Sequence, residues 1–262
     1  MTPGPLSFLR DTAAAHFAKA VDVGNDHVIF DVTPPMVSGA PPPTYRLRVD
    51  VVGEYAMVRE LQPTSLPAYC PERHINIDGG FCLYWGEVEP LSISGTQEAE
   101  TWWMKVLTFL KRQQVACALR RWPAKAEARA HGPDAALQQL IAEDAAAKLG
   151  PQFSTLLKDF RLTSVRSKTG SEPRLRLTLD GQRLVSVRER SRQLMTKRSR
   201  CKCDCADELR LPIRACGDHE TALTDMTFAL ERLEKAEKEF FRVYANSGRV
   251  CCGTMEDCPL AA

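Results

Sequence analysis

One cysteine lies in a segment whose residue types could support nucleophilic chemistry. The segment runs from His74 to Trp85 and reads HINIDGGFCLYW. Gly79 and Gly80 allow the backbone to turn sharply just before Cys82, which has large apolar neighbours. A nucleophilic thiol needs access, thiolate character and donors for a developing oxyanion, and an irregular loop offers exposed amides and polar side chains for these tasks. Cys82 is therefore the candidate nucleophile.

A second set of thiols gathers near the C-terminus. The chain has ten cysteines, and seven of them fall in its last quarter. Together with one histidine they offer eight potential ligands, enough for two tetrahedral zinc sites. The expected ligands are Cys201, Cys203, Cys205, Cys216, His219, Cys251, Cys252 and Cys258. Because the Cys-x-Cys steps differ from the common Cys-x-x-Cys spacing, the sequence leaves open how these ligands divide between two sites.

Structural zinc is the expected cofactor of this cysteine-rich region. A small region with few large apolar residues gains stability from a metal, since binding is coupled to folding. Free thiols, disulfides or an iron–sulfur cluster are the alternatives, although a cluster needs only four thiolates and explains the histidine less well. Catalytic zinc is not indicated, because no histidine-rich open site with a general base is visible.

The elements that must position Cys82 are predicted from hydrophobic periodicity. An opening helix is expected at about 6–20, and an amphipathic helix over 97–119, in which Trp102 and Trp103 belong to the core. Between them, alternating residues predict three strands, followed by an irregular segment that holds Cys82. The expected strands are 27–32, 45–51 and 55–58.

The second half of the chain has a different pattern. A helix is predicted over 133–149, because Pro133 opens it and Gly150 follows its end. Strands are expected at 160–165, 174–179 and 184–187, with Asp180-Gly181 as the hairpin turn between the last two. A long helix over 220–245 separates the two groups of clustered cysteines.

The first half resembles the ubiquitin-conjugating enzyme family. The resemblance lies in the order of elements, the His-x-Asn-Ile segment and the apolar-Cys-Leu step. In that family a His-Pro-Asn run precedes the cysteine by ten residues, whereas here Ile75 takes the proline position and Cys82 follows His74 by eight. The shortened loop and the tryptophan-rich helix are similar to bacterial conjugating enzymes found beside ubiquitin-like activating enzymes and antiphage signalling systems. The resemblance covers roughly residues 5–150.

The expected fold is α+β in two parts. The resemblance implies that residues 1–150 form a ubiquitin-conjugating-type catalytic domain, with an N-terminal helix, an antiparallel meander and further helices. Residues 151–262 lie outside the resemblance, and their strand pattern and clustered thiols predict a small cysteine-rich α+β accessory domain stabilised by zinc. The accessory domain is expected to dock a partner.

The resemblance also implies an activity and a site. Cys82 would accept the C-terminus of a ubiquitin-like modifier from an activating enzyme as a thioester, then pass it to an amine, usually lysine, of a protein target. Asn76 matches the asparagine that supports the oxyanion, and His74 orders the loop. Asp78 and Glu87 are the nearest candidates for the deprotonating carboxylate. A role in antiviral defence would follow from the bacterial branch.

Two other classes of function stay open. The chain could be a catalytically inactive binding module with the conjugating fold, or a thiol- or metal-sensing protein that acts through its C-terminal cysteines. Cys70, in a loop, and Cys117, on the expected buried face of a helix, are interpreted as ordinary small side chains.

Composition and charge narrow the expected partners. The net charge of +2 gives no indication of nucleic-acid binding. No secretory signal and no apolar run of membrane-spanning length is visible, so we expect a cytoplasmic protein that does not bind membranes.

Overall fold

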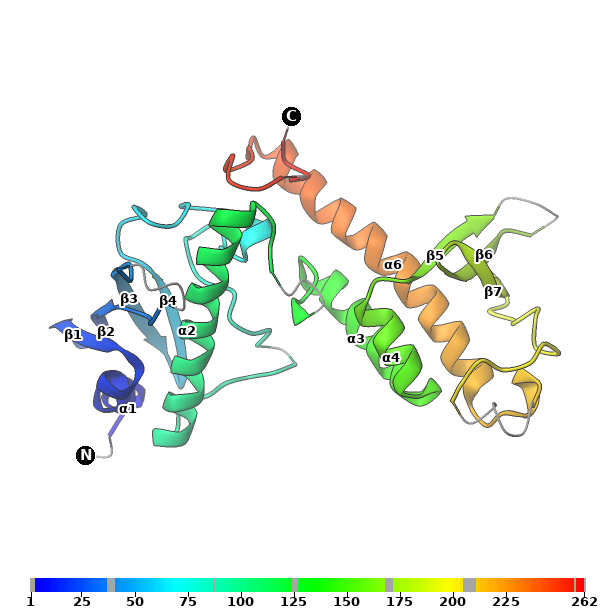
Figure 1. The fold of residues 1–262 in the computed structure, drawn as a ribbon, viewed down its shortest axis with the longest axis horizontal. Coiled ribbons are helices and arrows are strands. Elements are labelled where there is room, and N and C mark those ends of the chain that lie inside the picture. The colour runs from blue at the N-terminus through cyan, green and yellow to red at the C-terminus, as the bar shows by residue number, and fades with distance from the viewer. Residues whose placement is uncertain are drawn as a thin grey trace. The chain divides into compact units, whose positions relative to one another are not determined.

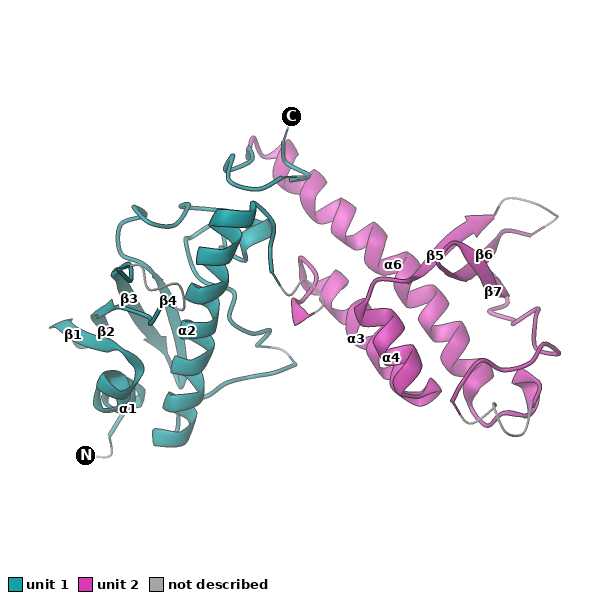
Figure 2. Ribbon diagram, in the orientation of Figure 1, with its two compact units in different colours: residues 1–123, 249–262 teal, residues 124–248 magenta. Residues whose placement is uncertain are grey.

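The computed structural model describes residues 3–36, 41–86, 88–123, 127–167, 172–204, 211–256 and 258–261. The chain forms two compact units, residues 1–123 with 249–262, and residues 124–248 (Figure 2). Each unit combines helices with an antiparallel sheet, which confirms the expected α+β class. The division differs from the expected boundary at residue 150, because the helix before it packs against the last helix of the second unit.

Unit 1 is built on a four-stranded antiparallel meander in the order β1-β2-β3-β4. One face of the sheet is buried, and α2 supplies the opposing apolar residues (Figure 1). Trp102 and Trp103 of α2 are fully buried, as expected, and their indole N–H groups donate to the carbonyls of Ala56 and Leu9. The elements of this unit are α1 (Pro5–Thr12), η1 (Ala13–His16), β1 (Ala18–Val23), β2 (His27–Val32), β3 (Tyr45–Val52), β4 (Tyr55–Glu60), η2 (Pro71–Arg73) and α2 (Thr96–Leu119).

The N-terminal helix is shorter than predicted. The expected helix over 6–20 ends as α1 at Thr12, followed by one 3-10 turn. Phe17 then adopts a left-handed conformation (φ 57°), which stops helical propagation. The next residues form β1, in which Ala18 pairs with Val32 of β2. The alanine-rich sequence resembles a helix locally, but pairing with β2 determines its conformation.

Unit 2 contains helices and a three-stranded antiparallel sheet in the order β5-β6-β7. The Asp180-Gly181 turn between β6 and β7 has positive φ at both residues (49° and 78°), as this type of hairpin requires. The short helix α4 was not expected from the sequence. The elements are α3 (Pro133–Leu149), α4 (Pro151–Lys158), β5 (Leu162–Ser167), β6 (Arg174–Leu179), β7 (Gln182–Arg188), η4 (Ile213–Ala215) and α6 (His219–Asn246).

The core of unit 2 contains buried residues from its helices, its sheet and part of the cysteine-rich region. Cys201, Cys203 and Cys216 are buried in the same apolar cluster as Leu175 and Met226. Among the described residues of the whole chain, no helix combines the length and apolar character that crossing a bilayer would need.

Candidate functional site

The segment from His74 to Cys82 forms a tight β-hairpin. Ile75 and Phe81 are paired as an antiparallel bridge, flanked by hydrogen bonds from Cys82 N to His74 O (2.9 Å) and from Asn76 N to Gly80 O (2.8 Å). The turn is closed by Gly79 N donating to Asn76 O over 3.0 Å. Gly79 has φ 79°, a conformation that glycine adopts without steric cost. Cys82 therefore lies at the base of a well-defined hairpin.

The two faces of this hairpin differ in burial. Ile75 and Phe81 are buried in the core of unit 1, whereas Asn76 is exposed and Cys82 is half-buried. Side chains alternate between faces along paired strands, so Asn76 and Cys82 lie on the face opposite to the core. Asn76 is paired with Gly80, two residues before Cys82, and such diagonal neighbours are about 7–8 Å apart. At Gly80 the place of a side chain is taken by the Asp78 carboxylate, whose Oδ1 would lie 2.9 Å from an added Cβ.

The sheet and α2 hold the hairpin in place. Phe81 N donates to Val58 O of β4 over 2.8 Å, and Gly80 bridges Arg59. The Phe81 ring stacks on Phe109 of α2 with centroids 4.4 Å apart. These contacts fix the residue next to Cys82 on one side, so β4 and α2 together position the thiol.

A buried polar pair fixes the approach to the hairpin. Arg73, which is 2% exposed, donates from Nε to Gln113 Oε1 over 2.6 Å, and Gln113 Nε2 donates back to the Arg73 carbonyl over 2.6 Å. His74 follows with φ 54°, and its ring lies 4.9 Å from that of Trp122. His74 thus contacts Cys82 through its backbone carbonyl, while its ring packs on an indole.

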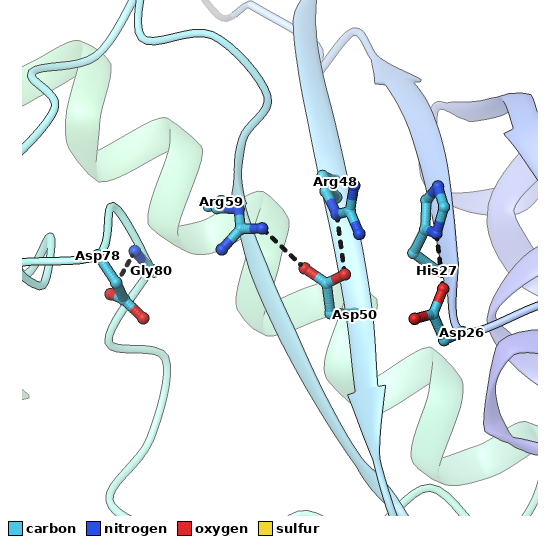
Figure 3. Close-up of polar contacts among 7 residues, drawn as sticks. All are labelled: Asp26, His27, Arg48, Asp50, Arg59, Asp78 and Gly80. Carbon is cyan, nitrogen blue, oxygen red and sulfur yellow. Dashed lines mark hydrogen bonds and ion pairs between the residues drawn. The ribbon is translucent and has the colours of Figure 1, made fainter. Parts of the chain in front are cut away.

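Asp78 lies on the turn of the hairpin. Its Oδ1 accepts the N–H of Gly80 over 2.9 Å, and the carboxylate is exposed (Figure 3). On the adjacent strands, Asp50 pairs with Arg48 (2.8 Å) and Arg59 (3.3 Å). Glu87, the other candidate for the deprotonating carboxylate, lies outside the described residues.

Burial controls the acidity of the candidate nucleophile. Removal from water raises the pKa of the Cys82 thiol above its ordinary value, because the thiolate loses solvation. At neutral pH the group is therefore largely a thiol, and its reaction needs a base or a charge supplied on contact with a partner.

A compact ligand cluster lies in unit 2. The ligand atoms of Cys201, Cys203, Cys216 and His219 are all within 4.8 Å of one another and could hold a metal ion. Cys201 Sγ lies 3.5 Å from His219 Nδ1, and Cys203 Sγ lies 3.5 Å from Cys216 Sγ. Three thiols and an imidazole are a donor set that suits tetrahedral zinc. Cys205, also expected as a ligand, lies outside the described residues.

The three remaining expected ligands lie in the other unit. Cys251, Cys252 and Cys258 belong to the C-terminal tail that returns to unit 1. There Cys252 Sγ lies 3.0 Å from Sγ of Cys70, a cysteine interpreted from its loop position as an ordinary small side chain. The eight predicted ligands are therefore not one cluster. Cys117 is exposed on α2, so its expected burial was wrong, since Gln113 and Ala116 occupy the buried face.

The tail thiols differ in acidity. The hydrogen bond between Cys252 and Cys70 lowers the pKa of Cys252 to about 5, and the same contact together with burial raises the pKa of Cys70. Burial raises the pKa of Cys258 to about 11, and the nearby Cys251 thiol adds to this.

Comparison with known proteins places both halves of the chain in described families. Residues 16–124 match a family model described as "Prokaryotic E2 domain". Residues 130–260 match one described as "Cysteine-rich domain, C-terminal to E2 domain". The search of curated proteins and the search of solved structures each found no match.

Proposed function

Because the chain belongs to a prokaryotic E2 family in which a cysteine-rich domain follows the E2 domain, we propose that Cys82 carries a ubiquitin-like modifier as a thioester. The Cys82 thiolate attacks the carbonyl carbon of the thioester held by the activating enzyme, a new C–S bond forms, and the activating enzyme's thiolate leaves. A target amine, usually that of lysine, then attacks the same carbon. The amide forms, Cys82 leaves as thiolate, and the amine proton passes to a base.

The main support is the position of Cys82 on the hairpin. Its backbone is held by His74, its neighbour Phe81 is buried, and its own side chain lies on the face opposite to the core. The C-terminal residues of a modifier must reach the sulfur, and a half-buried side chain on this face can be reached.

Asn76 and His74 have separate roles in this proposal. The Asn76 side chain, exposed on the Cys82 face of the hairpin, donates to the oxyanion that develops on the thioester carbonyl. His74 orders the hairpin through its carbonyl bond to Cys82 N and its packing on Trp122. Asp78 is the carboxylate of the described hairpin that can receive the proton from the attacking amine.

The metal of unit 2 is proposed to be structural zinc. Cys201, Cys203 and Cys216 are buried in the core and His219 opens α6, so an ion bound there ties the loop before η4 to the helix. All four ligand positions are filled by protein side chains, which suits a closed structural site. The unit it stabilises serves to dock the activating enzyme, the modifier or the target.

A transfer assay with matched variants tests the role of Cys82. The full chain is incubated with its cognate activating enzyme, the ubiquitin-like modifier and ATP, and adducts are resolved with and without a reducing thiol. Wild-type protein and Cys117→Ser, which alters an exposed cysteine on α2, should give a thiol-sensitive adduct. Cys82→Ala should give none, and Cys82→Ser should give a thiol-resistant oxyester.

The same assay separates the competing functions. Adducts that persist in Cys82→Ala would overturn the assignment of the nucleophile. If Cys82→Ala keeps partner binding and cellular function, the inactive binding module is correct instead. If Cys82→Ala keeps cellular function while Cys201→Ser or Cys251→Ser abolishes it, the thiol- or metal-sensing alternative is correct. Phage challenge of cells that carry wild-type protein or Cys82→Ala tests the proposed role in antiviral defence.

A further inference from the structure

A second group of four thiols lies entirely within unit 1. Cys70 comes from the loop before the hairpin, and Cys251, Cys252 and Cys258 come from the C-terminal tail. Cys70 is 1% exposed and Cys258 is 5% exposed, while the other two are half-buried. Because residues distant in sequence are brought together here, local sequence spacing does not reveal the group.

Two of the four sulfurs are in direct contact, and the backbone brings the other two near them. Cys70 Sγ lies 3.0 Å from Cys252 Sγ. One peptide bond joins Cys252 to Cys251, whose N–H donates to the carbonyl of Leu260 over 3.1 Å, and Cys258 lies two residues before Leu260. Tetrahedral zinc with Zn–S bonds of about 2.3 Å holds its sulfurs about 3.8 Å apart, so it needs sulfurs gathered as closely as this.

Polar groups support two of these sulfurs in the way that thiolate ligands need. Gly253 N donates to Cys251 Sγ over 3.3 Å, and Thr254 Oγ1 lies 3.0 Å from Cys252 Sγ. Such donors offset the negative charge of coordinated thiolates and orient them, which is the usual role of groups around a metal centre.

The tail is also anchored to unit 1 around the thiols. Arg73 Nη1 donates to Thr254 Oγ1 over 3.3 Å, which brings a buried guanidinium next to the group. At the end of α2, Glu256 N donates to Arg120 O over 2.8 Å, and Arg120 Nη2 donates to Gly253 O over 3.2 Å. The positive charge of Arg73 would partly balance the net charge of about −2 that four thiolates and Zn²⁺ carry.

From this arrangement we propose that Cys70, Cys251, Cys252 and Cys258 form a second zinc site, separate from the cluster in unit 2. The site closes the C-terminal tail onto the E2 domain. This assignment goes beyond the proposed transferase function and does not depend on the reactivity of Cys82.

The position of Cys70 gives the site a specific mechanical consequence. Cys70 is bridged to Ile75 by two backbone hydrogen bonds (3.1 and 3.0 Å), and Ile75 is bridged to Phe81. Cys70, Ile75 and Phe81 thus lie on three neighbouring backbone segments, and zinc bound at Cys70 stabilises the outer segment, which pairs with the Cys82 hairpin. Loss of the metal should loosen residues 70–82 without affecting unit 2.

The test measures zinc per chain in full-length protein, purified without chelator and dialysed against zinc-free buffer. Wild type and the exposed-cysteine control Cys117→Ser should contain two zinc ions. Cys252→Ser, which alters a half-buried residue of the tail, and Cys216→Ser should each contain one, and the double variant none. Hydrogen exchange should increase over residues 70–82 in Cys252→Ser but not in Cys216→Ser.

Two results would overturn the second site. One is a zinc content that is the same in Cys252→Ser and in wild type, with Cys70→Ser also unchanged. The other is one zinc per wild-type chain, lost in Cys216→Ser, with a Cys70–Cys252 disulfide detected as the loss of two hydrogens in the intact mass.

Discussion

The N–H of Cys82 donates to the carbonyl of His74 across 2.9 Å, so the candidate nucleophile and the histidine eight residues before it are opposite each other in one hairpin. The eight-residue spacing, shorter than that of the family it resembles, is therefore a closed two-stranded turn. The shape of the turn depends on Gly79, and its base depends on the core packing of Ile75 and Phe81.

Gly79→Ala should distort this hairpin. The added Cβ meets only ordinary contact, 3.6 Å from Ala68 O, but φ 79° costs a non-glycine residue about 1–2 kcal/mol. We expect a loss of stability of that size by urea denaturation, and slower thioester formation. Gly86→Ala, where no atom lies within 4 Å of the added Cβ, is the matched control and should leave both quantities unchanged. Equal effects of the two variants would contradict this role of Gly79.

Gln113→Ala should destabilise unit 1. Gln113 is fully buried and exchanges hydrogen bonds with Arg73, so its truncation leaves the buried Nε–H and the carbonyl of Arg73 without that partner. An unsatisfied buried group of this kind costs about 1–3 kcal/mol, and more for a charged one. The measurement is the free energy of unfolding in urea. Gln97→Ala, at an exposed position of α2, should change it by less than about 0.5 kcal/mol.

Alkylation of Cys82 should depend steeply on pH. Burial raises the pKa of this thiol, so the thiolate fraction at pH 7 is small and increases with pH up to that raised value. The iodoacetamide rate at Cys82, followed by site-resolved mass spectrometry, should rise about tenfold per pH unit between pH 7 and 9. A plateau below pH 8 would mean that a cation or hydrogen-bond donor stabilises the thiolate.

Removal of metal from unit 2 should lower its stability. Zinc at Cys201, Cys203, Cys216 and His219 would stabilise the folded unit by about 4 kcal/mol when free zinc exceeds the dissociation constant a thousandfold. Cys216→Ser or a strong chelator should therefore lower the melting temperature of unit 2 and expose the start of α6 to protease. Cys117→Ser, tested alongside, should melt as wild type does. A chelator that leaves the melting of unit 2 unchanged would refute this metal dependence.

Local signals in the sequence were sufficient for many elements. Helix α3 has the predicted bounds because Pro133 and Gly150 mark its ends, and the β6–β7 hairpin follows from Asp180-Gly181 and strict alternation. Strand β1 was missed because residues 13–20 have no strand alternation, and only pairing with β2 makes them extended. Helix α4 was missed although Gly150-Pro151 marks its start.

Turn residues and hydrophobic periodicity act over a few neighbours, so they were enough to predict that Cys82 lies in a glycine turn between a meander and an amphipathic helix. The sequence also revealed the clustered thiols, but not how these ligands divide between two sites. Only the tertiary structure separated Cys201, Cys203, Cys216 and His219 from the tail and brought Cys70 to Cys252. The physical reason is that the chain returns to unit 1 after the long helix α6, so the nearest thiol to Cys252 across the fold is 182 residues away in sequence.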